Sequence, residues 1–503
     1  MISDMEMGWK RFGLQAGLIL LLTLLAFLPA MRAGFIWDDD TFLTENPRIK
    51  AEDGLYRFWC TAEAPDYFPL SSSSLWLEWR LWGMNATGYH VVNVVLHAVS
   101  SVLIWLVLKR LKIPGAWVAG LVFAVHPVNV ESVAWVTQRK NTLAMLFYVA
   151  SIFLYLRSES EKGRHWYLLS LGAFLLALLS KSSVVMLPFV LLGAVWWQQG
   201  KIVRRDVIRS IPFFGLSGFL GLVTIWFQYH RAIGETVVRA DNFLSRLASA
   251  GWAVWFYLGK AVVPYRLSFV YSRWELDAFA ITSYLPGVIL VGWMVLFWWY
   301  RKSWGRPLLF GLGYFVVTLF PVLGFFNIYF MRYSFVADHW QYSSIVGIIA
   351  LVVGTGTYAF NRWGKGLPQL ATIAGAILVG LLSFLTWRQS QIYHNPQTLW
   401  MDTISKNPDA WMAHGGLGYV LAEQDRLEEA TAHFLEALRI EPDDEIAHYN
   451  LGNVLARQGK LGEAIMHFSE ALRIKPDHEQ ARRNRRIALM MQKKSRRDHR
   501  PSF

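Results

Sequence analysis

Long apolar segments dominate the first 390 residues of this 503-residue chain. A bilayer core of about 30 Å is crossed by about 20 apolar residues in helical form. Because backbone polar groups in lipid must bond within their own segment, such segments fold as helices. Only 17% of the residues are charged, against roughly a quarter in soluble domains. We therefore predict eleven membrane-spanning helices, at 12–31, 88–108, 115–128, 141–156, 166–180, 183–199, 210–229, 281–300, 307–326, 341–360 and 367–387.

Charge sets the orientation of these helices. Segment 245–263 is apolar but carries Lys260, and we place it at the membrane interface because every short loop on one side is then basic, as cytoplasmic loops are. The N-terminus is then cytoplasmic, and loops 32–87 and 230–280 lie on the outer face with the C-terminal region. Segment 12–31 is read as a span because it lacks a small-residue cleavage site and many spans follow it.

The charge balance and the cysteine count exclude some classes. The net charge of +13 is explained by basic cytoplasmic loops, so nucleic acid is not an expected partner. The only cysteine, Cys60, rules out an intramolecular disulfide. The fold class is therefore all-α, a polytopic helix bundle that meets the lipid bilayer over residues 1–390.

Residues 391–503 differ from the rest and repeat with a period of 34 residues. The segments 436–444 (EALRIEPDD) and 470–478 (EALRIKPDH) nearly coincide. Small residues at fixed positions let paired helices approach, and a proline ends the second helix of each pair. This pattern is typical of tetratricopeptide repeats, so we predict a short α-solenoid over 391–493. Such repeats bind peptides or serve a structural role, and both interpretations stay open.

The solenoid has predicted ends of its own. A half-repeat at 396–408 precedes the two full units. Residues 478–493 form a basic capping helix, and the basic tail 494–503 is expected to be disordered.

Three consecutive carboxylates follow the first span, in the sequence FIWDDDTFLTENP at 35–47. Acidic residues often cap helices and solvate loops, which is one interpretation of Asp38, Asp39 and Asp40. A carboxylate at a membrane surface also serves as a general base or a metal ligand. Adjacent like charges raise one pKa, which suits a base.

Other polar groups gather at the outer ends of later spans. His90, Asn93 and His97 share one helix face; a metal site competes here with packed histidines, and we favour packing. Basic residues are normally concentrated on cytoplasmic loops, yet several lie on the predicted outer loops. They are either the one or two basic residues that outer loops commonly carry, or they surround an anionic ligand. The chain has no phosphate-binding loop, nucleotide fingerprint, metalloprotease motif or nucleophile elbow. The outer set consists of Tyr67, His126, Glu131, Arg139, Lys140, Lys181, Arg332, Asp338 and His339.

With these motifs in this order, the chain resembles the transmembrane and tetratricopeptide-repeat-containing family of C-type glycosyltransferases, which is related to protein O-mannosyltransferases. The resemblance covers nearly the whole chain. Departures are Ser182 in place of an acid, Asn141 in place of an aspartate, and SFVADH at 334–339, which point to a prokaryotic branch and a plasma membrane. The residues that carry it are Phe35, Asp38, Asp39, Asn46, Tyr67, Pro69, Leu70, Tyr89, His90, Asn93, His97, His126, Pro127, Glu131, Trp135, Arg139, Lys181, Arg332 and Tyr333.

The resemblance implies a GT-C-like fold in the membrane region. It also implies transfer of a hexose such as mannose from a polyprenyl-phosphate donor to a hydroxyl of a protein or other acceptor. Asp38 and Asp39 then fall to catalysis. The donor phosphate falls to Arg139, Lys181 and Arg332. Support of the acceptor or of the structure falls to Asp40, Tyr67, His90, His126, Glu131, Asp338 and His339.

General chemistry agrees with this assignment. Cations in a low-dielectric site stabilise the charge of a departing phosphate, and a carboxylate takes the acceptor proton. No metal ligands are assigned: a divalent metal is compatible with this chemistry but not required, because the cations can supply the electrostatic effect of a metal.

Two other function classes compete with the glycosyltransferase. A flippase for a lipid-linked glycan is expected to show inverted repeats and ionisable groups at mid-membrane, whereas here these groups lie at span ends on one face. A repeat scaffold with a membrane anchor has no need of eleven spans.

Overall fold

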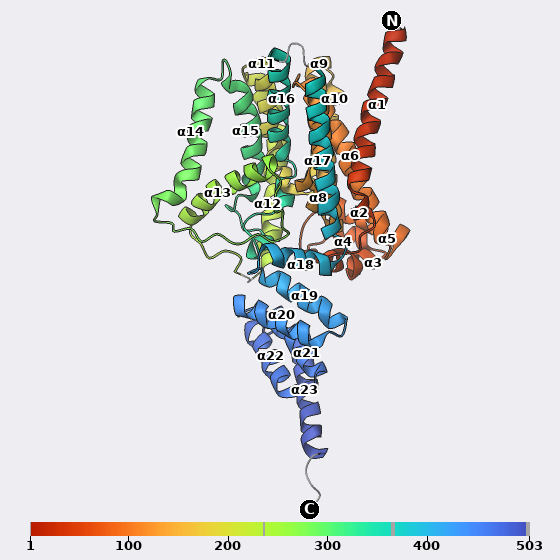
Figure 1. Ribbon diagram of the computed structural model, residues 1–503, viewed down its shortest axis with the longest axis vertical. Helices are drawn as coiled ribbons and strands as arrows, with labels where there is room; N and C mark the ends of the chain where they lie inside the picture. Colours follow the sequence, from red (N-terminus) through yellow and green to blue (C-terminus); the bar gives the residue numbers. More distant parts are fainter. Residues whose placement is uncertain (1, 235–236, 364–367, 499–503) are drawn as a thin grey trace, which may run out of the picture. The chain divides into compact units, whose positions relative to one another are not determined.

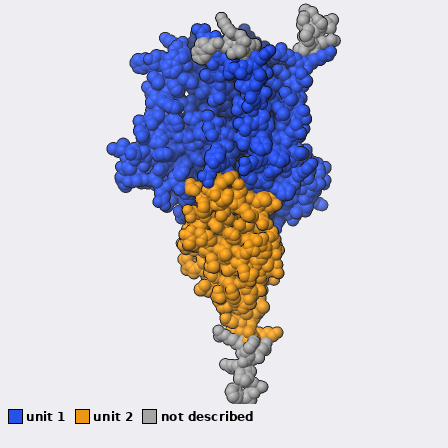
Figure 2. All heavy atoms as spheres, viewed as in Figure 1, with its two compact units in different colours: residues 1–267, 273–394 blue, residues 268–272, 395–503 orange. Residues whose placement is uncertain are grey.

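The computed structural model describes residues 2–234, 237–363 and 368–498. It divides into two compact units, coloured separately in Figure 2. Unit 1 contains residues 1–267 and 273–394, and unit 2 contains residues 268–272 and 395–503. The start of the last predicted span, residue 367, lies outside the described residues, as do 499–503.

Long apolar helices build unit 1 (Figure 1). Eight described helices are long and apolar enough to cross a membrane, and a ninth is added if the bent pair α7 and α8 counts as one span. The predicted segments 12–31 and 166–180 are helical as well, although α10 has only 17 residues. These helices are α1 Ile2–Ala26, α2 Leu28–Met31, α6 Ala86–Arg110, α7 Ala116–Ala124, α8 Val130–Ala134, α9 Arg139–Glu161, α10 Arg164–Ser180, α11 Leu187–Gln199, α12 Arg204–Phe227, α14 Leu285–Trp299, α15 Gly305–Leu319, α16 Ile345–Trp363 and α17 Pro368–Ile392.

The chain returns to one face of unit 1 after each pair of long helices. This alternation is the geometry of helical hairpins, so the loops that follow α2, α8, α10, α12 and α17 meet at a common face. Four hydrogen bonds join residues at this common face. They run from the Thr137 N–H to Asp39 Oδ1 at 2.9 Å, from Lys181 Nζ to Asn141 Oδ1 at 2.7 Å, from Gln228 Nε2 to Asp66 Oδ1 at 2.5 Å, and from the Gly34 N–H to the His394 carbonyl at 2.9 Å.

Segment 245–263 forms α13, Phe243–Val262. The Arg239 guanidinium before α13 lies 4.2 Å from the ring centroid of Phe335, which follows α14 and α15. Helices α14 and α15 form one hairpin and cross the membrane twice. If Arg239 and Phe335 lie on the same face, α13 between them does not cross the membrane. Figure 1 shows α13 running obliquely to α14, α15 and α16, and α13 is not among the described helices suited to crossing.

The third predicted span, 115–128, is broken. Helix α7 ends at Ala124, and α8 continues after the short turn η2, Pro127–Asn129, at an angle of 47°. The break follows from Pro127, because proline clashes with the preceding helical turn and lacks an N–H. His126 caps the new turn by accepting the Val128 N–H.

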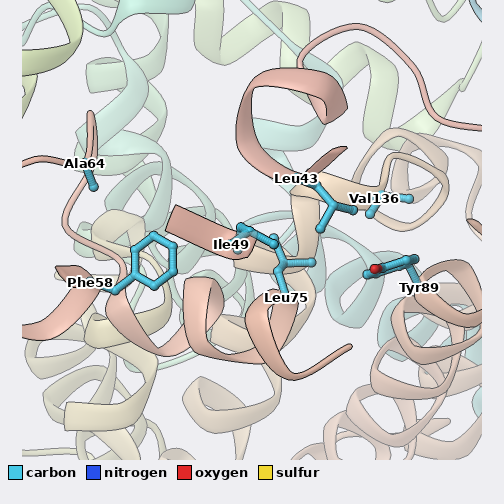
Figure 3. Close-up of a cluster of buried hydrophobic side chains, with 7 residues drawn as sticks. All are labelled: Leu43, Ile49, Phe58, Ala64, Leu75, Tyr89 and Val136. Atoms are coloured by element: carbon cyan, nitrogen blue, oxygen red, sulfur yellow. The ribbon is translucent and has the colours of Figure 1, made fainter. Parts of the chain in front are cut away.

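The first loop folds on a core of its own. It contains η1 Asp40–Thr44, α3 Pro47–Lys50, α4 Gly54–Cys60 and α5 Pro69–Trp82. Figure 3 shows the buried cluster that joins these helices to α6 and to the turn after α8: Leu43, Ile49, Phe58, Ala64, Leu75, Tyr89 and Val136. The carboxylate segment is thereby held on an ordered support.

Unit 2 is a solenoid of helix pairs. Gly418 and Gly452 lie where an added Cβ would be 3.0 Å and 2.7 Å from the rings of Phe434 and Phe468, so the close helix approach predicted from the repeat is present. Helix α23 continues to Asp498, and the expected disorder of 494–498 is therefore wrong. The helices are α18 Pro396–Lys406, α19 Trp411–Glu423, α20 Leu427–Ile440, α21 Glu445–Arg457, α22 Leu461–Ile474 and α23 Glu479–Asp498.

Five residues of the 230–280 loop also belong to unit 2. Phe269 is 2% exposed and packs edge-on against Trp400 of α18, with ring centroids 5.6 Å apart. Asn407 donates to the Val270 carbonyl at 3.4 Å and accepts from Ser272 Oγ at 2.9 Å. The segment 268–272 thus covers the first, incomplete repeat, which has no partner helix before α18 in the described chain.

Candidate active site

The carboxylates of the first loop have three different environments. Asp39 is fully buried, and its two oxygens accept the backbone N–H groups of Ile36 and Thr137, both at 2.9 Å. Because both oxygens are occupied by the backbone, Asp39 ties the loop to the turn after α8. This geometry supports a structural role for Asp39, and its catalytic role stays a prediction.

Asp38 differs from its neighbour because it is partly exposed. Its Oδ1 accepts from Trp135 Nε1 at 3.0 Å and from Thr137 Oγ1 at 2.9 Å. Its Oδ2 has no hydrogen-bond partner among the residues that the structure describes. Burial raises the pKa of Asp38 to about 6, although the positive charge of Lys140 opposes the rise. A carboxylate held by one oxygen, with a pKa near neutrality, is suited to accept a proton.

Asp40 is exposed, and its Oδ1 accepts from the Thr41 hydroxyl at 3.0 Å. It lies at the start of η1, so its observed contact is that of a helix-terminal residue.

An aromatic cluster positions the carboxylate segment. Trp37 has a φ of 42°, in the left-handed region that most side chains avoid. Its ring lies 5.2 Å from Trp135, 5.7 Å from Phe330 and 6.0 Å from Tyr333. Trp135 and Phe330 both contact the His339 ring, at 5.7 and 5.4 Å. The first loop, the turn after α8 and the segment 329–341 thereby meet at one place.

Arg139 is fully buried and engaged by protein groups. Its guanidinium forms an ion pair with Glu78 and donates to Asn93 Oδ1 at 2.6 Å, to Ser74 Oγ at 2.7 Å and to the Tyr89 carbonyl at 2.9 Å. A guanidinium with these partners is not available to an external anion. These contacts anchor the first loop and give no support to the predicted contact of Arg139 with the donor phosphate, which stays a prediction.

Lys181 lies in the turn between α10 and η4, Ser182–Val184, and is partly exposed. Its Nζ donates to Asn141 Oδ1 at 2.7 Å, and Asn141 donates to the His339 carbonyl at 3.2 Å. A pocket opens beside these groups. Its lining includes the hydrogen-bonded residues Lys181, Asn141 and His339, and also Ala144, Met145, Val322 and Tyr342.

Glu131 and His339 form a buried pair. His339 contributes its backbone N–H and its Nδ1, each 2.9 Å from a different oxygen of Glu131. This pair fixes η9, Asp338–Gln341, against α8. Asp338 is buried in the same turn, and Arg332 is half-buried in η8, Tyr329–Arg332.

The remaining candidates have structural contacts. His126 Nε2 lies 3.1 Å from the Ala261 carbonyl, and His90 Nε2 lies 3.3 Å from the Gly34 carbonyl. His97 contacts the Tyr342 hydroxyl at 2.7 Å, so these histidines take packing roles. The Tyr67 hydroxyl donates to the Trp59 carbonyl at 3.2 Å. In the described ranges, no three His, Cys, Asp or Glu side chains are grouped as a metal site.

Sequence reasoning missed Glu78, and it placed Lys140 only among the outer cations that are either ordinary or surround an anionic ligand. Glu78 is the only acidic residue of the tryptophan-rich helix α5 and pairs with a residue 61 positions away. No local sequence pattern therefore indicates its role. Lys140 was noted only as an outer cation beside Arg139. Its Nζ lies 5.2 Å from the Phe42 ring centroid, and its charge acts on Asp38, Lys181 and His339.

Comparison with known proteins agrees with this arrangement. Residues 66–227 match the dolichyl-phosphate-mannose-protein mannosyltransferase family, and residues 418–459 and 446–478 match tetratricopeptide repeats. A Caenorhabditis elegans protein O-mannosyl-transferase is 24% identical over 87% of this chain and 64% of its own length. Human protein O-mannosyl-transferase TMTC3 is 22% identical over 81% of this chain and 49% of its own.

A third relative, human protein O-mannosyl-transferase TMTC2, is 33% identical over 28% of this chain and 18% of its own length. The chain thus spans less than two thirds of each relative. Fold and matches together define a multi-pass, all-helical membrane protein with C-terminal tetratricopeptide repeats. In both regions the chain is similar to transmembrane and tetratricopeptide-repeat-containing proteins that are named protein O-mannosyl-transferases.

Proposed function

We propose that the chain is a membrane glycosyltransferase that moves a hexose, mannose being the first candidate, from a polyprenyl-phosphate donor to a hydroxyl of a protein acceptor. The acceptor oxygen forms a bond to C1 of the sugar, and the bond between C1 and the phosphate oxygen breaks. The polyprenyl phosphate leaves with the electron pair of that bond. The hydroxyl proton passes to the Asp38 carboxylate.

The observation that carries the proposal is the contrast between Asp38 and Asp39. Asp38 accepts hydrogen bonds through one oxygen only, whereas both oxygens of Asp39 accept backbone N–H groups. The pocket beside Lys181 is compatible with a lipid phosphate, because a cation and several apolar side chains are among its lining residues. Cations aimed at a leaving phosphate lower the barrier by stabilising its developing charge. A resident metal is not required.

The test is transfer of labelled sugar from a panel of polyprenyl-phosphate sugars by the purified protein to acceptor proteins. Asp38→Asn is expected to lower the rate by about 10²–10⁴-fold, the usual contribution of a general base. Asp53→Asn is the matched control, since Asp53 is an exposed carboxylate of the same loop that pairs with Arg57. Equal transfer by Asp38→Asn and the wild type contradicts the assignment, and no transfer from any donor favours the flippase or the scaffold.

We also propose that the first loop and the repeats lie on the outer face. Segment 268–272 packs in unit 2, and the described residues between it and residue 395 contain four helices suited to crossing. An even number of crossings brings both ends of that stretch to the same side.

Cys60 gives a direct test of this orientation because it is the only cysteine and is exposed in the first loop. A membrane-impermeant maleimide is expected to label it on intact cells. Labelling only after the membrane is opened contradicts the orientation.

A further inference from the structure

Trp37, the residue before the proposed base Asp38, has a strained backbone. Its φ of 42° lies in the left-handed region, where the Cβ of an L-residue comes too close to the following carbonyl oxygen. The carboxylate of Asp39 holds the chain in this conformation by accepting the backbone N–H groups of Ile36 and Thr137, both at 2.9 Å. Strain of this kind persists where the surroundings enforce it, and it clusters at functional sites. A large aromatic side chain at a backbone position that suits glycine indicates that the ring itself is used.

The Trp37 ring is the exposed member of the aromatic cluster at the carboxylates. The rings that it contacts are those of Trp135, Phe330 and Tyr333, which are 2%, 7% and 9% exposed. Trp37 and Asp38, in contrast, are both partly exposed. Trp135 joins the two, because its ring centroid lies 5.2 Å from that of Trp37 and its Nε1 donates to Asp38 Oδ1 at 3.0 Å. A molecule that reaches the Asp38 carboxylate from outside therefore meets an aromatic surface whose accessible part is Trp37.

The proposed transfer determines which part of the substrates lies at this surface. The acceptor hydroxyl must come within about 3 Å of the Asp38 carboxylate, and C1 of the sugar must come within about 3–3.5 Å of the acceptor oxygen. C1 is therefore within about 7 Å of the carboxylate, which brings the sugar ring to the side chain next to the base. The face of an aromatic ring is negative, so it attracts the weakly positive C–H bonds of a pyranose and repels a phosphate.

We propose that the indole of Trp37 binds the transferred hexose by stacking against the C–H face of its ring. This inference rests on the proposed function and deepens it, because it assigns a residue that distinguishes the sugar-bearing donor from bare polyprenyl phosphate. The contact orients C1 toward the acceptor oxygen at Asp38. It is lost once the sugar has been transferred, so Trp37 favours binding of the donor over rebinding of the polyprenyl-phosphate product. The enforced backbone and the three buried rings keep the indole beside the base.

The test compares two ligands on the same protein. Bare polyprenyl phosphate and a panel of polyprenyl-phosphate hexoses, led by the mannose ester, are titrated against the purified protein in nanodiscs of zwitterionic lipid. Trp37→Gly removes the ring and relieves the strained φ. It is expected to weaken binding of the hexose ester that the wild type prefers by about 3–10-fold, the range for one aromatic contact, and to leave binding of bare polyprenyl phosphate unchanged.

Two further variants and a control complete the design. Trp37→Phe is expected to keep most of the preference for the ester and Trp37→Leu to lose it, which gives the same comparison if Trp37→Gly does not fold. Trp59→Ala is the control, because Trp59 is an exposed tryptophan of the same loop whose Nε1 donates to Ser73 Oγ at 2.9 Å.

The outcomes separate the two proposals. If Trp37→Gly binds the hexose ester and bare polyprenyl phosphate as the wild type does, the sugar contact is refuted and the proposed function stands. If the variant weakens both ligands alike, the ring supports the loop and the sugar assignment is overturned. An unchanged ratio of the two affinities with a higher KM for the acceptor protein assigns the ring to the acceptor and also overturns it. A wild type that binds no polyprenyl-phosphate hexose of the panel overturns both proposals.

Discussion

Replacing Glu78 by glutamine is expected to destabilise the protein by about 3 kcal/mol. Removing one partner of a buried ion pair costs about 3–5 kcal/mol, because an uncompensated charge stays in the interior. Side-chain exposure is 0% for Arg139 and 7% for Glu78, so water cannot replace the lost carboxylate. Only Oε1 of Glu78 bonds to Arg139, and Oε2 has no hydrogen-bond partner among the described residues. Glutamine therefore keeps the hydrogen bond and loses the charge, which places the cost at the lower end.

The assay is chemical and thermal unfolding of the purified variant, followed by the fluorescence of the protein's tryptophans. Glu63→Gln is the control, because its ion pair with Arg57 is 3.7 Å long and exposed, and exposed pairs contribute little. Polyprenyl-phosphate binding is measured on the same samples. A Glu78→Gln protein as stable as the wild type, with tighter phosphate binding, would refute the reasoning: it would mean that Arg139 faces the phosphate and that Glu78 merely attenuates it.

Three further predictions concern pH and the repeat unit. Transfer is expected to fall about tenfold per pH unit below pH 6, because burial raises the pKa of Asp38 to about 6 and only the ionised form accepts a proton; a pH–rate profile that is flat from 5 to 7 contradicts this. Phe269→Ala is expected to cost unit 2 about 3–5 kcal/mol, seen as faster hydrogen exchange in α18 of the intact chain. Burial and a facing histidine lower the pKa of His433 and His467 from the usual 6.5. The folded repeats therefore bind fewer protons than the unfolded chain, so the stability that these histidines contribute is fully present above pH 6.5 and is expected to decrease as the pH falls below it. Unfolding measured at pH 5.5 and at pH 7.5 checks this.

The helices and the repeats could be predicted because their signals are local. Apolar segments of membrane length and a 34-residue period depend on neighbouring residues along the chain. The bend after α7 was also encoded locally, by Pro127, although the prediction treated 115–128 as one span. Orientation relative to the cytoplasm stays a prediction.

The candidate site was predictable by region and not by role. The segment with Asp38 and Asp39 could be recognised. Adjacent carboxylates are equivalent in the sequence, however, and only the folded backbone determines which of them accepts hydrogen bonds from its N–H groups. Arg139 and Lys140 are adjacent in the same way. Only the position of Glu78 on α5 determines that Arg139 is the one that forms a buried ion pair. Such choices depend on contacts between residues about 60 to 100 positions apart, which no local pattern contains.

The five residues 268–272 have a consequence for how the protein is made. Val270 and its partner Asn407 are 137 residues apart. At a synthesis rate of about 5–20 residues per second, the segment waits on the order of ten seconds for α18, while four apolar helices enter the membrane. During that time the Phe269 side chain has no cover from Trp400. The repeat unit is thus completed late in biogenesis, and a repeat fragment produced without this segment would expose an apolar surface that the whole chain covers.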